Sequence, residues 1–156
     1  MNELNKALKV AVEAHKNQLN KFDREPYILH VLRVVTNTKA VCDALKVKDA
    51  ETYLVVAALH DVVEDTDLSL LHLMSLAFSP AVVAAVDAVT HKKDEPYDEY
   101  IERCAANGYA AVVKTADLTD HLNLTEKFAG QHAKYQKAQN RLLYGDGGLK
   151  KADGVY

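Results

Sequence analysis

The stretch AALHDVVEDTD at residues 57–67 decides how this chain folds and where its chemistry lies. An apolar run of helical composition leads directly into His60 and Asp61, and Glu64 and Asp65 follow one helical turn later. At about 100° per residue, His60 and Glu64 project to one side of a helix, as do Asp61 and Asp65. Burying such charges without partners is costly, so a bound cation would satisfy them. A solvated helix end capped by a His60–Asp61 ion pair is the alternative.

Two further helices each carry one metal-ligating residue type inside an apolar run. His30 lies in PYILHVLRVV at residues 26–35, and Asp117 lies in AAVVKTADLTDHL at residues 110–122. Either residue alone is more often a hydrogen-bonded core residue than a ligand. Three separate apolar helices that deliver His or Asp inward favour one shared site. Imidazole nitrogens and carboxylate oxygens suit Mn²⁺, Fe²⁺, Zn²⁺ or Mg²⁺, and the lack of cysteine in these segments disfavours a structural zinc site.

Helical spacing of apolar residues continues through the rest of the chain. Only three prolines and six glycines occur, and four of the glycines fall at or beyond Gly145. The expected helices include residues 50–63 and 80–91. We therefore predict an all-α fold, a single compact bundle of about seven helices over residues 1–145. The glycine-rich segment 146–156 is expected to be a loosely ordered tail.

Composition narrows the range of partners. The 156 residues are 49% hydrophobic and 26% charged, which is typical of one compact globular domain with room for an internal pocket. A formal net charge of −3 provides no basic field for a nucleic-acid backbone, although a small phosphorylated ligand stays possible. We therefore expect no nucleic-acid partner.

The cellular setting is expected to be the reducing cytoplasm. Cys42 and Cys104 are too few for a disulfide scaffold in a chain of this length. The N-terminal residues lack the apolar run of a signal peptide, and no apolar stretch approaches the roughly 20 residues that cross a bilayer. We expect no membrane partner, and the sequence leaves the oligomeric state open.

The order His30, His60–Asp61, Asp117 resembles the H…HD…D signature of the HD-domain phosphohydrolase superfamily, which holds a divalent metal in a helical bundle. Within that superfamily the chain is similar to the RelA/SpoT-type (p)ppGpp hydrolase domain, from about residue 7 to residue 145. The similarity is carried by AHKNQLNKFDREPYILHVLRVV at residues 14–35, HDVVEDT at residues 60–66 and VVKTADLTDHLNL at residues 112–124. The chain thus resembles the small stand-alone alarmone hydrolases, which include metazoan SpoT homologs.

The resemblance implies an activity and roles for individual residues. The implied metal ligands are His30, His60, Asp61 and Asp117, with manganese as the usual ion. Glu64 and Asp65 match an acidic pair that orients or deprotonates the attacking water. The implied reaction hydrolyses the 3′-pyrophosphate of (p)ppGpp to pyrophosphate and GDP or GTP. A metal that polarises a phosphoryl oxygen beside a carboxylate that accepts a proton is chemistry suited to this reaction.

The predicted substrate contacts depart from the family pattern in two places. In the loop QLNKFDRE at residues 18–25, Asn20 stands where an arginine is common and Lys21 remains as the basic residue for phosphate. A solvated polar loop is the alternative interpretation. His121 stands at the family's asparagine position, where its ring can donate a hydrogen bond to ribose or phosphate.

Three other residues are candidates for contact with the substrate. A changed register would bring Asp120 or Asn123 into the substrate contacts in place of the family's asparagine. Tyr135 matches an aromatic residue that packs near the nucleoside, and ordinary helix packing is its alternative. These departures keep a second substrate class open, either the 2′-phosphate of NADPH or a nucleoside monophosphate. A nucleotide-binding module with weak hydrolysis is a third hypothesis, although a pure binder has little need for the acidic pair.

Overall fold

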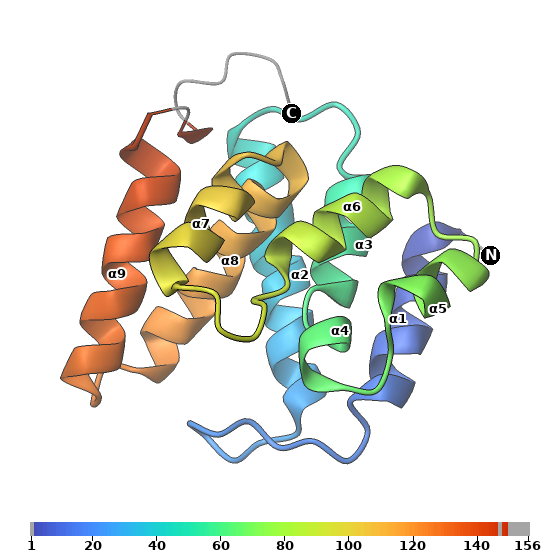
Figure 1. Ribbon diagram of the computed structural model, residues 1–156, viewed down its shortest axis with the longest axis horizontal. Helices are drawn as coiled ribbons and strands as arrows, with labels where there is room; N and C mark the ends of the chain where they lie inside the picture. Colours follow the sequence, from blue (N-terminus) through green and yellow to red (C-terminus); the bar gives the residue numbers. More distant parts are fainter. Residues whose placement is uncertain (1, 147, 150–156) are drawn as a thin grey trace.

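The computed structural model describes residues 2–146, 148 and 149, which fold into nine α-helices and no β-sheet (Figure 1). This architecture confirms the predicted all-α class. The helices are α1 Glu3–Ala14, α2 Tyr27–Ala44, α3 Glu51–Leu59, α4 Val62–Asp65, α5 Leu70–Ser75, α6 Pro80–Val89, α7 Tyr97–Ala105, α8 Gly108–Leu124 and α9 Ala129–Tyr144. None of these helices is long and apolar enough to cross a membrane.

Helix α8 occupies the centre of the bundle. It packs against α2, α3, α6, α7 and α9, while α1 covers α3 at the opposite edge of the molecule from α9 (Figure 1). The residues of α8 from Ala110 to Leu118 are all buried, including Lys114 and Asp117. A helix that is buried on every side carries its polar residues into the interior, where they need partners.

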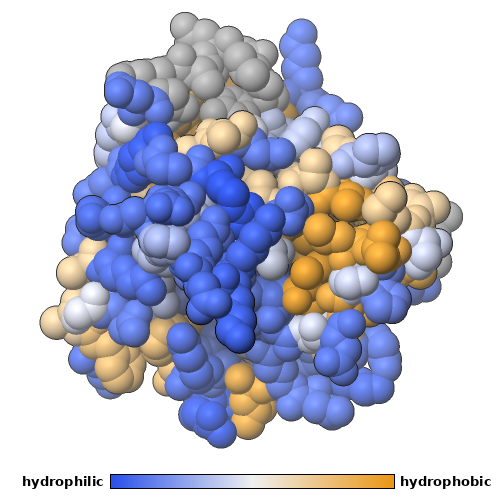
Figure 2. Space-filling view, viewed as in Figure 1, coloured by the Kyte–Doolittle hydropathy of each residue, from blue (hydrophilic) through white to orange (hydrophobic). Residues whose placement is uncertain are grey.

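Apolar contacts hold the bundle together in three clusters. The largest joins α1, α2, α3, α6 and α8 through buried side chains such as Val34, Val56 and Leu59. A second joins α7, α8 and α9 around Tyr100 and Leu118. On the surface, Figure 2 shows apolar side chains gathered over α5 and α6 beside a mainly polar face.

The predicted tail lies mostly outside the described residues. Residues 147 and 150–156 are not described, so the expected domain boundary at residue 145 stays a prediction. Leu149 is buried and packs in the third cluster with Cys42 and Tyr53. Cys42 and Cys104 are both buried free thiols.

One predicted helix is divided in two at the residues that matter most. The apolar spacing predicts one continuous helix over residues 50–63, but α3 ends at Leu59 and α4 begins at Val62. His60 turns its ring back onto its own helix, where Nδ1 donates to the carbonyl oxygen of Ala57 at 2.7 Å. This division contributes to the finding of nine helices in the described residues instead of about seven.

Helix α6 ends two residues before its predicted limit because Arg103 satisfies its last carbonyl groups. The guanidinium donates to the backbone oxygens of Asp87 at 3.1 Å and Thr90 at 2.8 Å, and it pairs with Glu95 at 2.6 Å. Orphan carbonyls at a helix end need such donors. Because the helix ends at Val89, the backbone N–H of His91 lies outside it and donates a hydrogen bond to Glu64.

Two leucines of α5 provide a test of this packing. Leu73 is fully buried in the main core, whereas Leu71 is 74% exposed on the same helix. Leu73→Ala removes buried apolar contacts and leaves a cavity, so we expect the free energy of unfolding to fall by about 2–5 kcal/mol. Leu71→Ala is the control and is expected to change it by less than about 0.5 kcal/mol. Urea unfolding followed by circular dichroism measures both, and equal losses would contradict the packing described.

Candidate metal centre and adjoining pocket

Four side chains from separate parts of the chain converge in the interior. His30 comes from α2, Asp117 from α8, and His60 and Asp61 from the turn between α3 and α4. One ligand atom of each lies within 4.8 Å of the other three, and all four residues are buried. The structure therefore brings together all four residues that the sequence singled out as metal ligands.

Three of the converging atoms lack hydrogen-bond partners among the described residues. His30 Nε2, His60 Nε2 and Asp117 Oδ1 are buried without one. His30 Nε2 lies 3.1 Å from Asp117 Oδ1, and His60 Nε2 lies 2.8 Å from Asp61 Oδ2. Neighbouring ligand atoms around an octahedral ion with bonds of about 2.1 Å are spaced roughly 3 Å apart. Because buried polar atoms are nearly always satisfied, this set fits a divalent cation.

The imidazole rings are turned so that Nε2 is the free nitrogen. His60 Nδ1 donates to the backbone oxygen of Ala57, and His30 Nδ1 donates to Asp120 Oδ2 at 2.6 Å. A ring nitrogen that donates carries the proton, so the lone pair lies on the other nitrogen. This holds for the neutral rings, so both Nε2 atoms can bind a metal ion once it displaces the protons that the nearby carboxylates hold there.

The two carboxylates also have supporting partners. The Tyr27 hydroxyl donates to Asp61 Oδ2 at 2.6 Å, and Lys114 Nζ donates to Asp117 Oδ2 at 2.7 Å. Burial raises the pKa of Asp61, but His60 and His30 hold it well below its usual range. In the same way, burial lowers the pKa of His60, but the attraction of Asp61 and Asp117 raises it to about 10. The charges of this cluster therefore favour a cation among these groups.

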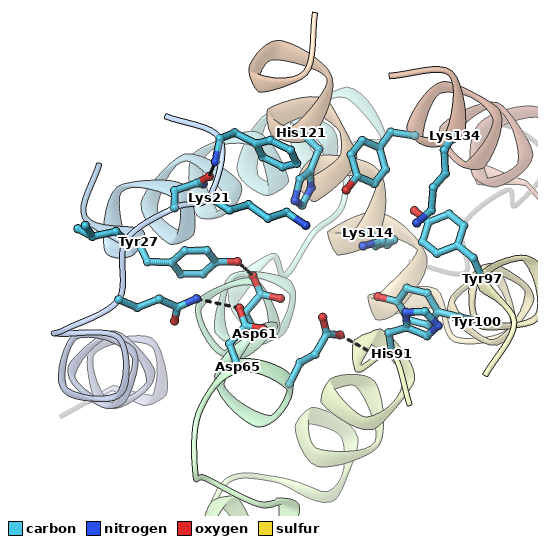
Figure 3. Close-up of a pocket in the computed structure, with 16 residues that line it drawn as sticks. Lys21, Tyr27, Asp61, Asp65, His91, Tyr97, Tyr100, Lys114, His121 and Lys134 are labelled. Carbon is cyan, nitrogen blue, oxygen red and sulfur yellow. Dashed lines mark hydrogen bonds between the residues drawn. The ribbon is translucent and has the colours of Figure 1, made fainter. Parts of the chain in front are cut away.

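A pocket of about 300 Å³ opens beside Asp61, and its acidic side carries the predicted catalytic pair (Figure 3). Glu64 accepts a hydrogen bond from the backbone N–H of His91 at 2.7 Å, and Asp65 accepts one from the Gln18 amide at 3.2 Å. Loss of hydration and the charge of Asp61 raise the pKa of Glu64 to about 6. The same two causes raise the pKa of Asp65.

Three lysines also line the pocket. Lys114 lies deep, paired with Asp117, while Lys21 and Lys134 are more exposed. Partial burial and repulsion by the other two lysines lower the pKa of Lys134. Mutually repelling cations next to a cluster of acids suit a ligand that carries several negative charges and reaches a bound metal ion.

All four predicted substrate residues border this pocket: Asn20, Lys21, His121 and Tyr135. The side-chain oxygen of Asn20 accepts from the Phe22 N–H at 2.9 Å, so it also holds the loop. The His121 ring lies 4.9 Å from the Tyr135 ring, and its Nδ1 donates to the backbone oxygen of Asp117 at 3.1 Å. Their contacts with a substrate stay predictions.

The alternative register on α8 receives no support. Asn123 lines a separate groove with Leu32 and Arg33. Asp120 faces that groove too, and its carboxylate is engaged by His30 and Arg33. His121 is therefore the residue of this turn that borders the pocket.

Several pocket residues were missed by reasoning from the sequence. Lys114 carried a signal, because a lysine inside an apolar helical run three residues before Asp117 lies on the same helix face. Tyr27 had the same spacing from His30. A last set of pocket residues carried no such signal, because only tertiary packing brings the end of α6, α7 and α9 to the pocket. These residues are His91, which follows α6, and Tyr97, Tyr100 and Lys134.

Known proteins share this fold and its sequence pattern, although no family model matches the chain. The chain is 36% identical over 121 residues to the guanosine-3′,5′-bis(diphosphate) 3′-pyrophosphohydrolase MESH1 of Drosophila melanogaster. That match covers 74% of this chain and 65% of the fly protein, so it spans slightly less than two thirds of the curated relative. A solved structure of a metazoan ortholog of SpoT, described as hydrolysing ppGpp and acting in starvation responses, superposes with a TM-score of 0.74 at 28% identity. It covers 99% of this chain and 89% of that one.

The raised pKa of Glu64 predicts a stability effect that depends on pH. A carboxyl whose pKa is raised from 4.5 to about 6 on folding destabilises the folded state once it ionises. Glu64→Gln keeps an acceptor for the His91 N–H and removes the charge. We expect it to stabilise the fold by up to about 1 kcal/mol above pH 6, discounted for solvent screening, and to have no effect below pH 4.5.

The measurement is urea unfolding across this pH range with a chelator present. Glu126→Gln is the control, because Glu126 is exposed and lies outside the pocket. A stabilisation that is equal at all pH values would contradict the assignment.

Proposed function

We propose that this chain, which is similar to two proteins described as ppGpp hydrolases, hydrolyses the 3′-pyrophosphate of (p)ppGpp with the help of a bound metal ion. The two relatives confirm the resemblance that the sequence showed and its helical HD-type fold. One observation of the structure carries the proposal furthest. Three buried ligand atoms without hydrogen-bond partners among the described residues converge next to a pocket that is lined by an acidic pair and three lysines.

We propose that the metal ligands are His30, His60, Asp61 and Asp117, and that the ion is Mn²⁺. Such an ion would polarise a phosphoryl oxygen and lower the pKa of a coordinated water. The cytoplasm remains the expected location, and the two buried free thiols are in keeping with it.

Glu64 is the proposed general base. With a pKa of about 6 it is mostly ionised at neutral pH, yet it is basic enough to accept a proton from the attacking water. The hydrogen bond from the His91 N–H fixes its direction, and the Gln18 amide does the same for Asp65. The water oxygen bonds to the phosphorus attached to the ribose 3′-oxygen. The bond from that phosphorus to the 3′-oxygen breaks, and the 3′-oxygen takes up a proton, which gives GDP and pyrophosphate from ppGpp.

The opposite side of the pocket is the proposed place for the substrate. Lys21, Lys114 and Lys134 would offset phosphate charge, and Tyr135 and His121 would contact the nucleoside. A pure nucleotide-binding role fits less well, because Glu64 is held in an arrangement that raises its pKa and therefore costs stability.

A hydrolase assay with purified protein and Mn²⁺ tests the proposed activity. We expect ppGpp to yield GDP and pyrophosphate, and we expect a chelator or Asp61→Ala to abolish turnover. NADPH and a panel of nucleoside monophosphates run in parallel. Turnover of one of these with ppGpp left intact would contradict the alarmone substrate and favour the second substrate class. Binding without turnover of any of them would favour the binding module.

A second prediction addresses the general base. Glu64→Gln should lower kcat by about 10²–10⁴-fold, because it cannot accept a proton, while ppGpp binding changes only slightly. For the unsubstituted protein, kcat/KM should rise with pH and level off above a midpoint no higher than about 6, since a bound cation lowers a nearby carboxyl pKa. Glu126→Gln is the control. A variant at Glu64 with unchanged kcat would remove this residue from the mechanism.

A further inference from the structure

A chain of contacts supports His30 from behind, on the side away from the substrate pocket. His30 Nδ1 donates to Asp120 Oδ2 at 2.6 Å. Arg33 makes a bidentate contact with the same carboxylate, in which Nε donates to Oδ1 at 2.6 Å and Nη2 donates to Oδ2 at 3.1 Å. Both oxygens of Asp120 are therefore engaged, and a bidentate arginine leaves the carboxylate little freedom to rotate.

The register of two packed helices produces this arrangement. On α2, Arg33 follows His30 by three residues, and on α8, Asp120 follows Asp117 by three residues. Residues at this spacing lie on one helix face. Helices α2 and α8 pack side by side (Figure 1), so each presents one proposed metal ligand and one supporting residue to the other.

The support matters because His30 differs from His60 in how its ring is fixed. His60 Nδ1 donates to a backbone carbonyl of its own helix, which no substitution removes. His30 depends on a side chain from another helix. Asp120 is only 3% exposed, and His30 and Arg33 engage both of its carboxylate oxygens. A carboxylate paired with an arginine accepts hydrogen bonds, so its contact with Nδ1 keeps a proton on that nitrogen and turns Nε2 toward the other proposed ligands.

We propose that Asp120, clamped by Arg33, is the positioning residue that holds His30 in the tautomer and orientation needed to bind the metal ion. This inference rests on the metal role in the proposed function, and it assigns roles to two residues outside the substrate pocket. Supporting carboxylates behind metal-ligating histidines change metal affinity by about 10–100-fold.

The test measures Mn²⁺ affinity by calorimetry, apart from any turnover. Asp120→Asn is expected to raise the dissociation constant for Mn²⁺ by about 10–100-fold, because a neutral amide does not enforce a proton on His30 Nδ1. Nitrogen-15 NMR of the histidine rings in protein loaded with diamagnetic Zn²⁺ should show loss of the protected proton on His30 Nδ1. Asp43→Asn is the matched control, since Asp43 forms an exposed ion pair with Lys39 on α2. It is expected to leave both readouts unchanged.

A second variant separates positioning from simple loss of stability. Arg33→Met frees the carboxylate from its clamp but leaves Asp120 in place, so a smaller loss of Mn²⁺ affinity is expected. Because Arg33 acts through Asp120, the double variant should bind Mn²⁺ no more weakly than Asp120→Asn alone. Arg33 is partly exposed, with a distant ion-pair partner in Asp23 at 3.7 Å, so its replacement is compatible with folding.

Three outcomes would overturn the inference. The first is a Mn²⁺ dissociation constant for Asp120→Asn within twofold of the unsubstituted protein, whether or not its unfolding free energy falls. The second is additive losses in the double variant. The third is no divalent-ion binding by the unsubstituted protein, which would overturn the proposed metal role as well. Mn²⁺ binding that depends on Asp120 without ppGpp turnover would support the inference and contradict only the proposed substrate.

Discussion

The interaction on which the structure depends is the approach of two buried carboxylates, Asp61 and Asp117, to the Nε2 atoms of His30 and His60. Bringing these groups out of water is costly, and it is tolerated only when each remaining polar atom has a partner. The partners come from the same helices and their ends. Tyr27 supports Asp61, Lys114 supports Asp117, and Asp120 supports His30. This need explains why α8, which supplies three of these residues, lies at the centre of the bundle instead of at its surface.

The same constraint accounts for the division between α3 and α4. A continuous helix would carry the residues after Leu59 along one straight axis. The break lets His60 stay inside against its own carbonyl while Asp61, Glu64 and Asp65 reach the pocket wall. The acids of this segment thus have two environments. Asp61 is buried and held ionised, whereas Glu64 borders solvent and has a raised pKa. One short turn provides a group fit to bind a cation and a group fit to accept a proton.

How much of this was predictable depends on how each residue reached its place. His30, His60, Asp61 and Asp117 each interrupt an apolar helical run, and this local signal is enough to locate the centre from the sequence. Lys114 and Tyr27 carried a similar signal through their three-residue spacing. Asp120 has the same spacing from Asp117, but its partner His30 lies on another helix, and periodicity within one helix does not determine the register between α2 and α8. The helix break was missed for a related reason. A side chain that hydrogen-bonds to the backbone of its own helix does not change the spacing of the apolar residues.

The distribution of charge in the pocket adds a further argument about the ligand. Lys134 and Lys21 repel each other and Lys114, and such repulsion is unfavourable unless an anion lies between them. The acids are equally crowded around Asp61 and need a cation. A metal ion alone would satisfy the acids but leave Lys21 and Lys134 without an anionic partner among the described residues, and a simple anion would do the reverse. A polyphosphate that binds a metal ion satisfies both sides at once. This charge arrangement therefore argues for the metal and the phosphorylated substrate together, independently of the sequence resemblance.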